Sequence, residues 1–186
     1  MMSTNDKTSQ IYTGMTGSTP IGKIGVAASD HGLVTVEFVE DEGDLVHILS
    51  QHYGWKMKNI HSTSESEFEN EIVDKACEQL EEYLTGEREE FDVPIDWSIM
   101  TPFQVEALQA TYNIAYGQVA TYKEIAHQIG KPRAPRAVGR AEATNPMPLV
   151  IPCHRVIGSD GGLHGYGGRG GLQTKAWLLR LEGARE

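Results

Sequence analysis

The sequence predicts an α+β protein with an α/β domain over residues 11–98 and a mostly helical domain over residues 99–186. Three observations support this prediction. Short apolar runs separated by turn residues fill the first half, whereas helix-capping signals recur in the second half. The charge also divides there, because residues 1–98 hold 6 Lys and Arg against 20 Asp and Glu, and residues 99–186 hold 10 against 6. The charge division therefore suggests that the second half alone can approach a polyanion. An equally acceptable interpretation is that the acidic residues simply keep the first half soluble.

Composition and length fit a soluble globular protein of 186 residues, with 39% hydrophobic and 23% charged residues. No apolar run approaches the roughly 20 residues that span a bilayer, and no signal peptide is visible at the start. Cys77 and Cys153 are the two cysteines, too few for a disulfide framework. We therefore expect a cytoplasmic protein that does not contact membranes.

The first half predicts strands followed by a helix. Residues 1–10 are polar and are expected to be disordered. Three apolar runs bounded by turn residues predict β-strands: Ile11–Met15, Lys23–Ala28 and Leu33–Val39. Apolar residues then recur at helical spacing over Ser66–Leu84, and Gly86 follows as a helix stop. A further short strand is predicted at Phe91–Ile95, and the domain boundary at Asp96–Met100.

The second half opens with a helix start at Thr101, where a capping hydroxyl is followed by Pro102 and by Gln104. Its predicted buried face consists of Val105, Leu108 and Tyr112.

A second capping box, Thr121-Tyr122-Lys123-Glu124, opens a short helix that ends at Gly130. After a turn, Pro135–Thr144 predicts a third helix that carries Arg136 and Arg140 one turn apart. This arrangement predicts a helix-turn-helix element, and its small residues would allow close approach to a partner. A helix pair that only packs a core would look the same.

The segment around Cys153 carries the chemistry. The apolar run Leu149–Ile151 leads into Pro152, so Cys153 is expected on a rigid turn. A free thiol is only a few per cent thiolate at neutral pH, so a nucleophilic cysteine needs a base or a cation nearby. His154 and Arg155 follow directly. Cys77 instead fits an inert buried thiol, and the cysteine spacing argues against a metal site.

These motifs resemble those of the O6-alkylguanine-DNA alkyltransferases. The resemblance covers residues 101–183 and, more loosely, the Thr19–Gly22 stretch. It rests on the following motifs: Ile151-Pro152-Cys153-His154-Arg155-Val156, Arg136-Ala137-Val138-Gly139, Asn145-Pro146, Gly165-Tyr166-Gly167-Gly168, Trp177-Leu178-Leu179 and Glu182-Gly183. It implies an RNase-H-like N-terminal domain and DNA repair by direct reversal, without a cofactor. The alkyl group of O6-alkylguanine, or of O4-alkylthymine, would pass irreversibly to the protein after base flipping in double-stranded DNA.

The resemblance also assigns roles to individual residues. Cys153 would accept the alkyl group, His154 would act through a water as its base, and Glu182 would hold His154. Asn145 would brace the turn, and Tyr122 would donate a hydrogen bond toward the base. Three further residues would bind the base: Val156, Tyr166 and Gly167. Arg136 would fill the vacated stack, and other residues would contact DNA: Ala137, Gly139, Arg140, Lys123, Lys131 and Ser159. A monomer is expected.

Two departures from the family pattern stand out. The Gly165–Gly171 loop is longer and richer in glycine than usual, with Arg169-Gly170 as the apparent insertion. No cysteine precedes Cys77, so the zinc site that some members build with N-terminal cysteines is absent and no metal is expected. The alternatives are a non-catalytic alkyltransferase-like protein that binds damaged DNA, a helix-turn-helix regulator, and a cysteine hydrolase. The first of these lacks the acceptor cysteine that is present here.

Overall fold

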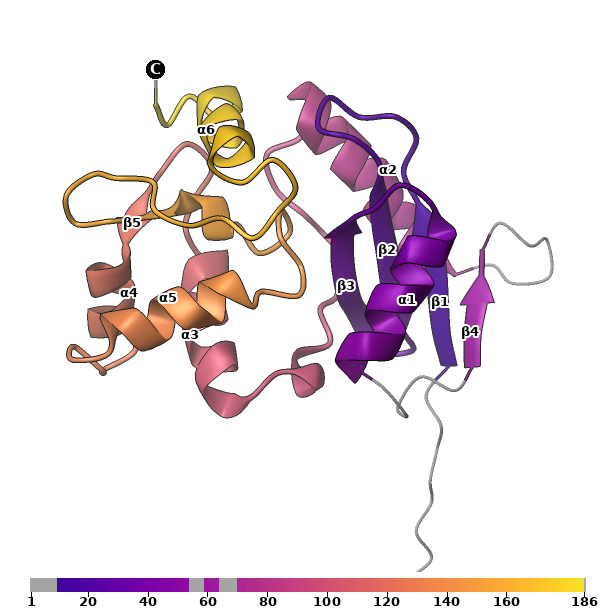
Figure 1. Cartoon of the computed structure of the whole chain (residues 1–186), viewed down its shortest axis with the longest axis horizontal. Helices are drawn as coiled ribbons and strands as arrows, with labels where there is room; N and C mark the ends of the chain where they lie inside the picture. Colours follow the sequence, from indigo (N-terminus) through magenta and orange to yellow (C-terminus); the bar gives the residue numbers. More distant parts are fainter. Residues whose placement is uncertain (1–9, 54–58, 64–69, 186) are drawn as a thin grey trace, which may run out of the picture.

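The computed structural model describes residues 10–53, 59–63 and 70–185, which form two domains side by side (Figure 1). The N-terminal domain contains a four-stranded sheet with the order β3-β2-β1-β4. Its strands are β1 (Gln10–Met15), β2 (Ile24–Ser29), β3 (Gly32–Phe38) and β4 (Asn59–Ser62). β1, β2 and β3 pair antiparallel, whereas β4 runs parallel to β1. The three predicted strands are confirmed, and β4 is an addition to them.

Two helices cover opposite faces of this sheet: α1 (Glu42–Tyr53) and α2 (Glu71–Thr85). Side chains alternate along a strand, so Ala27 packs in a cluster with Leu45 and Leu49 of α1. Its neighbours Val26 and Ala28 pack instead in the cluster that contains the buried face of α2. The sequence analysis missed α1, although its apolar residues Leu45, Ile48 and Leu49 recur at helical spacing.

The termini of α2 follow its sequence signals. The Asn70 side chain accepts hydrogen bonds from the first turn, and Gly86 ends the helix in the left-handed conformation, at a φ of 79°. The predicted start at Ser66 lies outside the described residues. So does the predicted disordered start, except for Gln10, where the prediction was wrong because that residue already belongs to β1.

The strand predicted at Phe91–Ile95 was wrong. In this stretch only Ile95 forms a bridge, with Leu33 at the edge of the sheet. Leu33 donates its N–H to the Pro94 carbonyl at 2.8 Å, and the Asp96 N–H donates back at 2.9 Å. Pro94 has no N–H to donate, so the pairing does not extend into a ladder.

The C-terminal domain begins after a short 3₁₀ helix, η2 (Trp97–Ile99). Its elements are α3 (Pro102–Tyr112), β5 (Ala120–Thr121), α4 (Tyr122–Gln128), α5 (Pro135–Ala143), η3 (Cys153–Arg155), β6 (Val156–Ile157) and α6 (Leu172–Leu181). Both predicted capping boxes are confirmed, at Thr101 and Thr121. Leu108 is buried as predicted, but Tyr112 is 37% exposed and packs edge-on against Trp97.

Helices α4 and α5 pack against each other and against α3, which gives the helix-turn-helix arrangement. None of the described helices combines the length and apolar character that crossing a bilayer requires.

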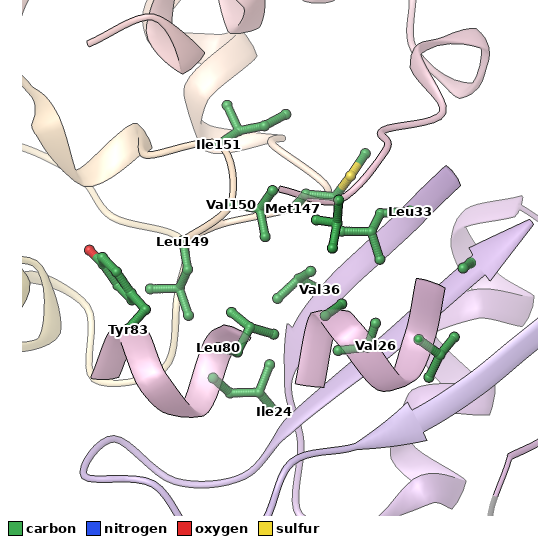
Figure 2. Close-up of a cluster of buried hydrophobic side chains, with 14 of the residues drawn as sticks. Ile24, Val26, Leu33, Val36, Leu80, Tyr83, Met147, Leu149, Val150 and Ile151 are labelled. Carbon is green, nitrogen blue, oxygen red and sulfur yellow. The ribbon is translucent and has the colours of Figure 1, made fainter. Parts of the chain in front are cut away.

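One hydrophobic core joins the two domains (Figure 2). The segment Met147–Ile151 packs its apolar side chains against the sheet and α2, near Val36 and Leu80. The side chains of Met147, Leu149, Val150 and Ile151 are at most 2% exposed, and burial of such a side chain stabilises the fold by roughly 1.5–3 kcal/mol. The Val36 N–H also donates to the Pro146 carbonyl at 2.9 Å. The chain that leads to Cys153 is therefore fixed by the N-terminal domain.

Candidate active site

Asn145 holds the turn that delivers Cys153. Its side-chain amide donates to the Ile151 carbonyl at 2.9 Å, and its carbonyl oxygen accepts from the Met147 N–H at 3.0 Å. Inside this turn Leu149 has a φ of 75°, which is unfavourable for a side chain with a Cβ. Burial of its side chain in the shared core offsets that strain. Cys153 then begins η3, so the rigid turn expected from Pro152 is a 3₁₀ turn.

Cys153 lies at the bottom of a cavity of about 420 Å³, called the base pocket below. The residues that line this pocket are Tyr122, Gly139, Glu142, Ala143, Cys153, His164, Gly165, Tyr166 and Gly167. Burial and the neighbouring carboxyl of Glu142 raise the pKa of Cys153 to about 12, against the opposing effects of Asn145 and Lys175. The resting side chain is therefore a thiol, and it needs a base to become a nucleophile.

His154 is completely buried and lies next to Glu182, with 2.8 Å between Nε2 and Oε1. Burial lowers the pKa of His154 even though Glu182 opposes the shift, so the imidazole is neutral. An ionised carboxylate only accepts, so Nε2 carries the proton and Nδ1 keeps a lone pair. Nδ1 is buried and has no hydrogen-bond partner among the described residues. This nitrogen is therefore the free basic position of the ring.

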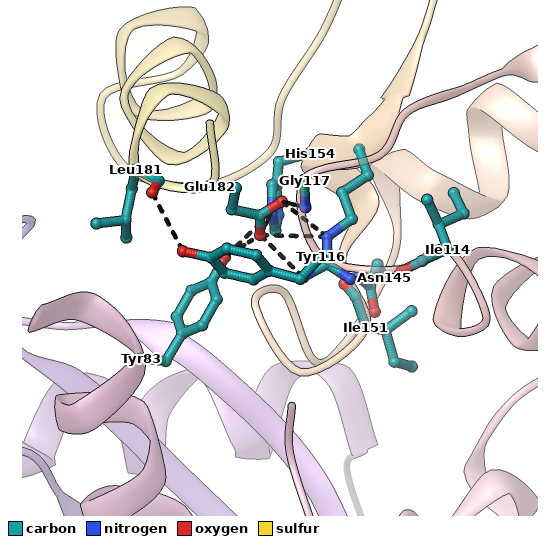
Figure 3. A network of polar contacts seen from close by, with 10 residues as sticks. Tyr83, Ile114, Tyr116, Gly117, Asn145, Ile151, His154, Leu181 and Glu182 are labelled. Carbon is teal, nitrogen blue, oxygen red and sulfur yellow. Dashed lines mark hydrogen bonds and ion pairs between the residues drawn. The ribbon is translucent and has the colours of Figure 1, made fainter. Parts of the chain in front are cut away.

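Glu182 is the centre of a buried polar network (Figure 3). Its carboxylate accepts from Arg155 Nε at 2.9 Å, from Arg155 Nη2 at 2.9 Å and from the Tyr83 hydroxyl at 2.5 Å. Burial raises the pKa of Glu182, but the hydrogen bonds from His154 and Arg155 outweigh burial and hold the pKa at about 2. Arg155 therefore neutralises Glu182 and does not act on the thiol.

Sequence reasoning missed Tyr83, which α2 contributes from the N-terminal domain. Its hydroxyl lies 3.2 Å from His154 Nε2 as well as 2.5 Å from Glu182 Oε1. The only signal in the sequence is its position three residues after Leu80, on the apolar face of a helix. That position predicts burial but not a partner 99 residues away.

The structure brings Tyr122, Cys153, Tyr166 and Gly167 together around the base pocket. The Tyr166 hydroxyl is buried and has no partner among the described residues. Val156 does not line this cavity, and its carbonyl accepts from the ammonium of Lys175 at 2.6 Å. Lys175 and Glu142 are further residues of this centre that sequence reasoning missed, since neither lies in a motif typical of a site.

The long Gly165–Gly171 loop rests on the N-terminal domain. Arg169 forms an ion pair with Glu40, and Gly168 lies so close to Phe38 that a Cβ there would come within 2.7 Å of its ring. Gly170 and Gly171 both have positive φ, 78° and 55°, and turn the chain into α6. Arg169 thus tethers the loop to the N-terminal domain, and Gly170 turns the chain before α6.

A second groove, of about 410 Å³, lies beside the base pocket on the outer face of α5. The residues that line it are Tyr122, Lys123, Pro135, Arg136, Gly139, Gly158, Ser159 and His164. Arg136, Lys123 and Ser159 are exposed there. Ala137 and Arg140 are also exposed on α5 but do not line the groove. Lys131 lies apart, in an ion pair with Glu106 and over the ring of Phe103.

The described residues contain no group of three or more His, Cys, Asp or Glu side chains that could hold a metal ion. The fold and the site together define a two-domain protein with a buried cysteine nucleophile beneath a helix-turn-helix element.

Comparison with known proteins gives the family. The ribonuclease-like domain of 6-O-methylguanine DNA methyltransferase matches residues 11–97, and the DNA-binding domain of the same family matches residues 102–184. A methylated-DNA–protein-cysteine methyltransferase of Methanosarcina barkeri is 40% identical over 163 residues, which cover 88% of this chain and 92% of that protein. The constitutive enzyme of Bacillus subtilis is 38% identical over 90% of this chain and 93% of its own length.

Among solved structures, Mycobacterium tuberculosis OGT in complex with DNA superposes with a TM-score of 0.72 at 34% identity, covering 94% of this chain and 93% of that chain. The chain belongs to the 6-O-methylguanine DNA methyltransferase family.

Proposed function

We propose that this protein repairs DNA by transferring the alkyl group from O6 of a flipped-out guanine to the sulfur of Cys153, once per molecule. The observation that carries the proposal is the buried thiol of Cys153 at the floor of a base-sized pocket, next to a neutral His154 that Glu182 orients. O4-alkylthymine is a second candidate substrate of the same pocket. Because the acceptor cysteine is present, a non-catalytic protein that only binds damaged DNA is not favoured.

In this mechanism the thiol proton passes through a water to His154 Nδ1. The thiolate then attacks the alkyl carbon, the bond from that carbon to O6 breaks, and guanine leaves with the electron pair. Tyr122 and the N–H of Gly167 lie on the pocket wall, where they would stabilise the developing charge on the base. Main-chain groups of Cys153 would bind the base edge, and Tyr166 would close the alkyl side. The Val156 carbonyl, which was expected to share this role, lies outside the pocket lining and accepts from Lys175.

DNA would bind across α5 and the groove beside it. The exposed Arg136 would occupy the space that the flipped base leaves, and Ala137 and Gly139 would let the helix approach the minor groove closely. Four other residues are assigned to the DNA backbone: Lys123, Lys131, Arg140 and Ser159. Residues 99–186 would thus contain the DNA surface and the acceptor, and residues 11–98 would brace them.

The two free thiols, Cys77 and Cys153, support work in a reducing compartment such as the cytoplasm. We propose a monomer as the working form, since one chain carries both the groove and the acceptor.

Arg136→Ala is expected to slow repair of alkylated duplex by at least about tenfold, because extruding the base costs a few kcal/mol and the arginine offsets part of that cost. The reaction with free O6-benzylguanine needs no flipping and should be unchanged. Single-turnover rates with both substrates measure the difference. Arg140→Ala, one helical turn further along the same exposed face, is the matched control: it removes a proposed backbone contact, so it should weaken duplex binding but not slow repair at saturating duplex. If Arg136→Ala lowered the single-turnover rate equally with both substrates, the result would mean that Arg136 supports the fold.

DNA affinity is expected to fall steeply with salt, since each phosphate that a cation neutralises contributes about 0.9 to the slope of log K against log salt concentration. Lys123→Ala should reduce the magnitude of that slope by about 0.9, the contribution of one phosphate contact. Lys75, which pairs with Asp92 in the N-terminal domain, provides the control substitution. Fluorescence anisotropy with labelled duplex measures both slopes. An unchanged slope for Lys123→Ala would remove this residue from the DNA surface.

A further inference from the structure

Glu142 is a buried carboxyl that the proposed mechanism does not use. It lies in the last turn of α5, one turn after Gly139, and is only 7% exposed. Its side chain lines the base pocket together with Cys153 and Tyr122. It also lines a narrower cleft of about 70 Å³ that reaches Cys153 from the side of Asn145. Glu142 therefore faces the reacting sulfur from two connected spaces.

Only one oxygen of this carboxyl has a partner. Oε1 accepts from the hydroxyl of Thr111 on α3 at 2.7 Å. Oε2 is buried and has no hydrogen-bond partner among the described residues, and Glu142 forms no ion pair with any of them. Buried polar atoms in native proteins are almost always paired. Because Glu142 lines a substrate-sized pocket and holds an unpaired buried oxygen, it points to a partner that enters the pocket.

The protonation state decides which partner fits. Burial raises the pKa of Glu142 to about 8, although the hydrogen bond from Thr111 and the charge of Lys175 oppose the shift. At neutral pH the side chain is therefore mostly a carboxylic acid, which carries one O–H donor. The neutral form also favours the reaction, because a negative Glu142 raises the pKa of Cys153.

A base alkylated at O6 supplies the matching acceptor. Alkylation at O6 removes the proton from N1 of guanine, so N1 becomes an acceptor in addition to N3 and N7, and only the exocyclic amino group donates. A hydrogen-bond donor on the pocket wall complements such a ring, whereas a carboxylate opposes it.

We propose that Glu142 contacts the flipped base directly, its carboxylic acid donating a hydrogen bond from Oε2 to a ring nitrogen of the O6-alkylated purine. The inference rests on the proposed function, because it names a further substrate contact in the same pocket. It makes Glu142 a further substrate-binding residue, and one that selects for the alkylated base where the accepting nitrogen is N1.

The test measures single-turnover transfer from free O6-benzylguanine and from its N1, N3 and N7 deaza analogues, in which a C–H replaces one acceptor. With one of these analogues the transfer rate of wild type should fall about tenfold, as expected for one lost hydrogen bond in a closed site. Glu142→Leu should react about tenfold more slowly than wild type with O6-benzylguanine. Its transfer rate should not fall further with that analogue. Glu142→Gln keeps an N–H donor and should stay within about threefold of wild type. Thr111→Val, which removes the partner of Oε1 only, controls for disturbed packing between α3 and α5.

The pH dependence of the transfer rate provides a second measurement. It tests the contact between Glu142 and the base even if Glu142→Leu does not fold. Wild-type transfer should fall above about pH 8 as Glu142 ionises, and Glu142→Gln should fall less. The other titratable groups around the pocket and cleft are common to both proteins: Cys153, Lys175, Tyr122, Tyr166, His164 and Glu37. Burial lowers the pKa of Lys175 to about 8, while the charge of Glu142 opposes that shift. Glu142→Gln removes this opposing charge, so a fall caused by Lys175 would move to lower pH in the variant, opposite to the expected change.

The inference would be overturned if the rate with each analogue, divided by the rate with O6-benzylguanine, were the same in wild type and Glu142→Leu. Parallel pH profiles of wild type and Glu142→Gln would overturn it as well. Either result would leave the proposed function intact. A wild-type protein that takes no alkyl group from O6-benzylguanine or from methylated duplex would overturn both.

Discussion

Cys153→Ser is expected to abolish alkyl transfer while duplex affinity stays within about threefold, because phosphate contacts dominate DNA binding. A serine hydroxyl keeps the shape of the side chain, but it is far less acidic than a thiol whose pKa is already raised to about 12, so no nucleophile forms. Intact-mass spectrometry after mixing with methylated duplex measures the result. Wild type should gain one methyl group, and the variant none.

The matched control is Cys77→Ser. Cys77 lies on α2, does not line the base pocket, and has a pKa that burial raises to about 12 with help from Asp74 and Glu81. This variant should accept one methyl group like wild type. Methyl transfer to Cys77 in the Cys153→Ser protein would contradict the assignment of Cys153.

The same experiment tests the stoichiometry. The product is a thioether, which has no acyl carbon for water to attack, so His154 cannot regenerate the thiol. Titration against excess methylated duplex should therefore reach a plateau of about one methyl per chain. Sustained turnover, or methanol among the products, would instead indicate a hydrolase.

Glu182→Gln is expected to destabilise the protein by about 3–5 kcal/mol, because it leaves the buried charge of Arg155 without its counter-ion. Transfer should slow as well, since His154 loses the carboxylate that fixes its tautomer. Urea unfolding followed by fluorescence measures the free energy of unfolding. The control is Glu82→Gln, which breaks the partly exposed pair with Arg88 and should cost no more than about 1 kcal/mol. Equal effects of the two substitutions would contradict a central role for Glu182.

The pH dependence of stability gives an independent test of Glu182. Its pKa falls from 4.5 to about 2 on folding, so it stabilises the native state above the unfolded pKa. This contribution, about 3 kcal/mol, is lost as the pH falls from about 4.5 towards 2. In Glu182→Gln the acid limb of the stability curve should become shallower by about that amount. An unchanged acid limb would show that the pKa of Glu182 is not depressed in the native state.

The features that depend on local signals were predictable from the sequence. Thr101 and Thr121 mark helix starts because a capping box involves only four neighbouring residues. The motif around Cys153 predicted the family because it, too, consists of residues that are neighbours in the sequence. By contrast, α1 was missed although Leu45, Ile48 and Leu49 show the helical period. Pro94 ended a pairing that composition alone favoured.

The residues missed at the site depend on distant contacts. Tyr83 becomes part of the site only when α2 packs against the segment Leu149–Ile151. The role of Glu142 depends on which of its oxygens finds a partner, and no spacing in the sequence reveals this. Arg155 lies two positions after Cys153 in the sequence, whereas three-dimensional packing pairs it with Glu182.

The long-range network around Glu182 has a consequence for biosynthesis. A ribosome makes Tyr83 first, His154 71 residues later and Glu182 28 residues after that. Since N-terminal domains generally fold first during synthesis, the sheet and α2 can be complete while His154 still lacks its carboxylate. A nascent chain in that state carries Cys153 but not the oriented base that ionises it. In the proposed mechanism the acceptor would therefore become reactive only after Glu182 has been added and has docked.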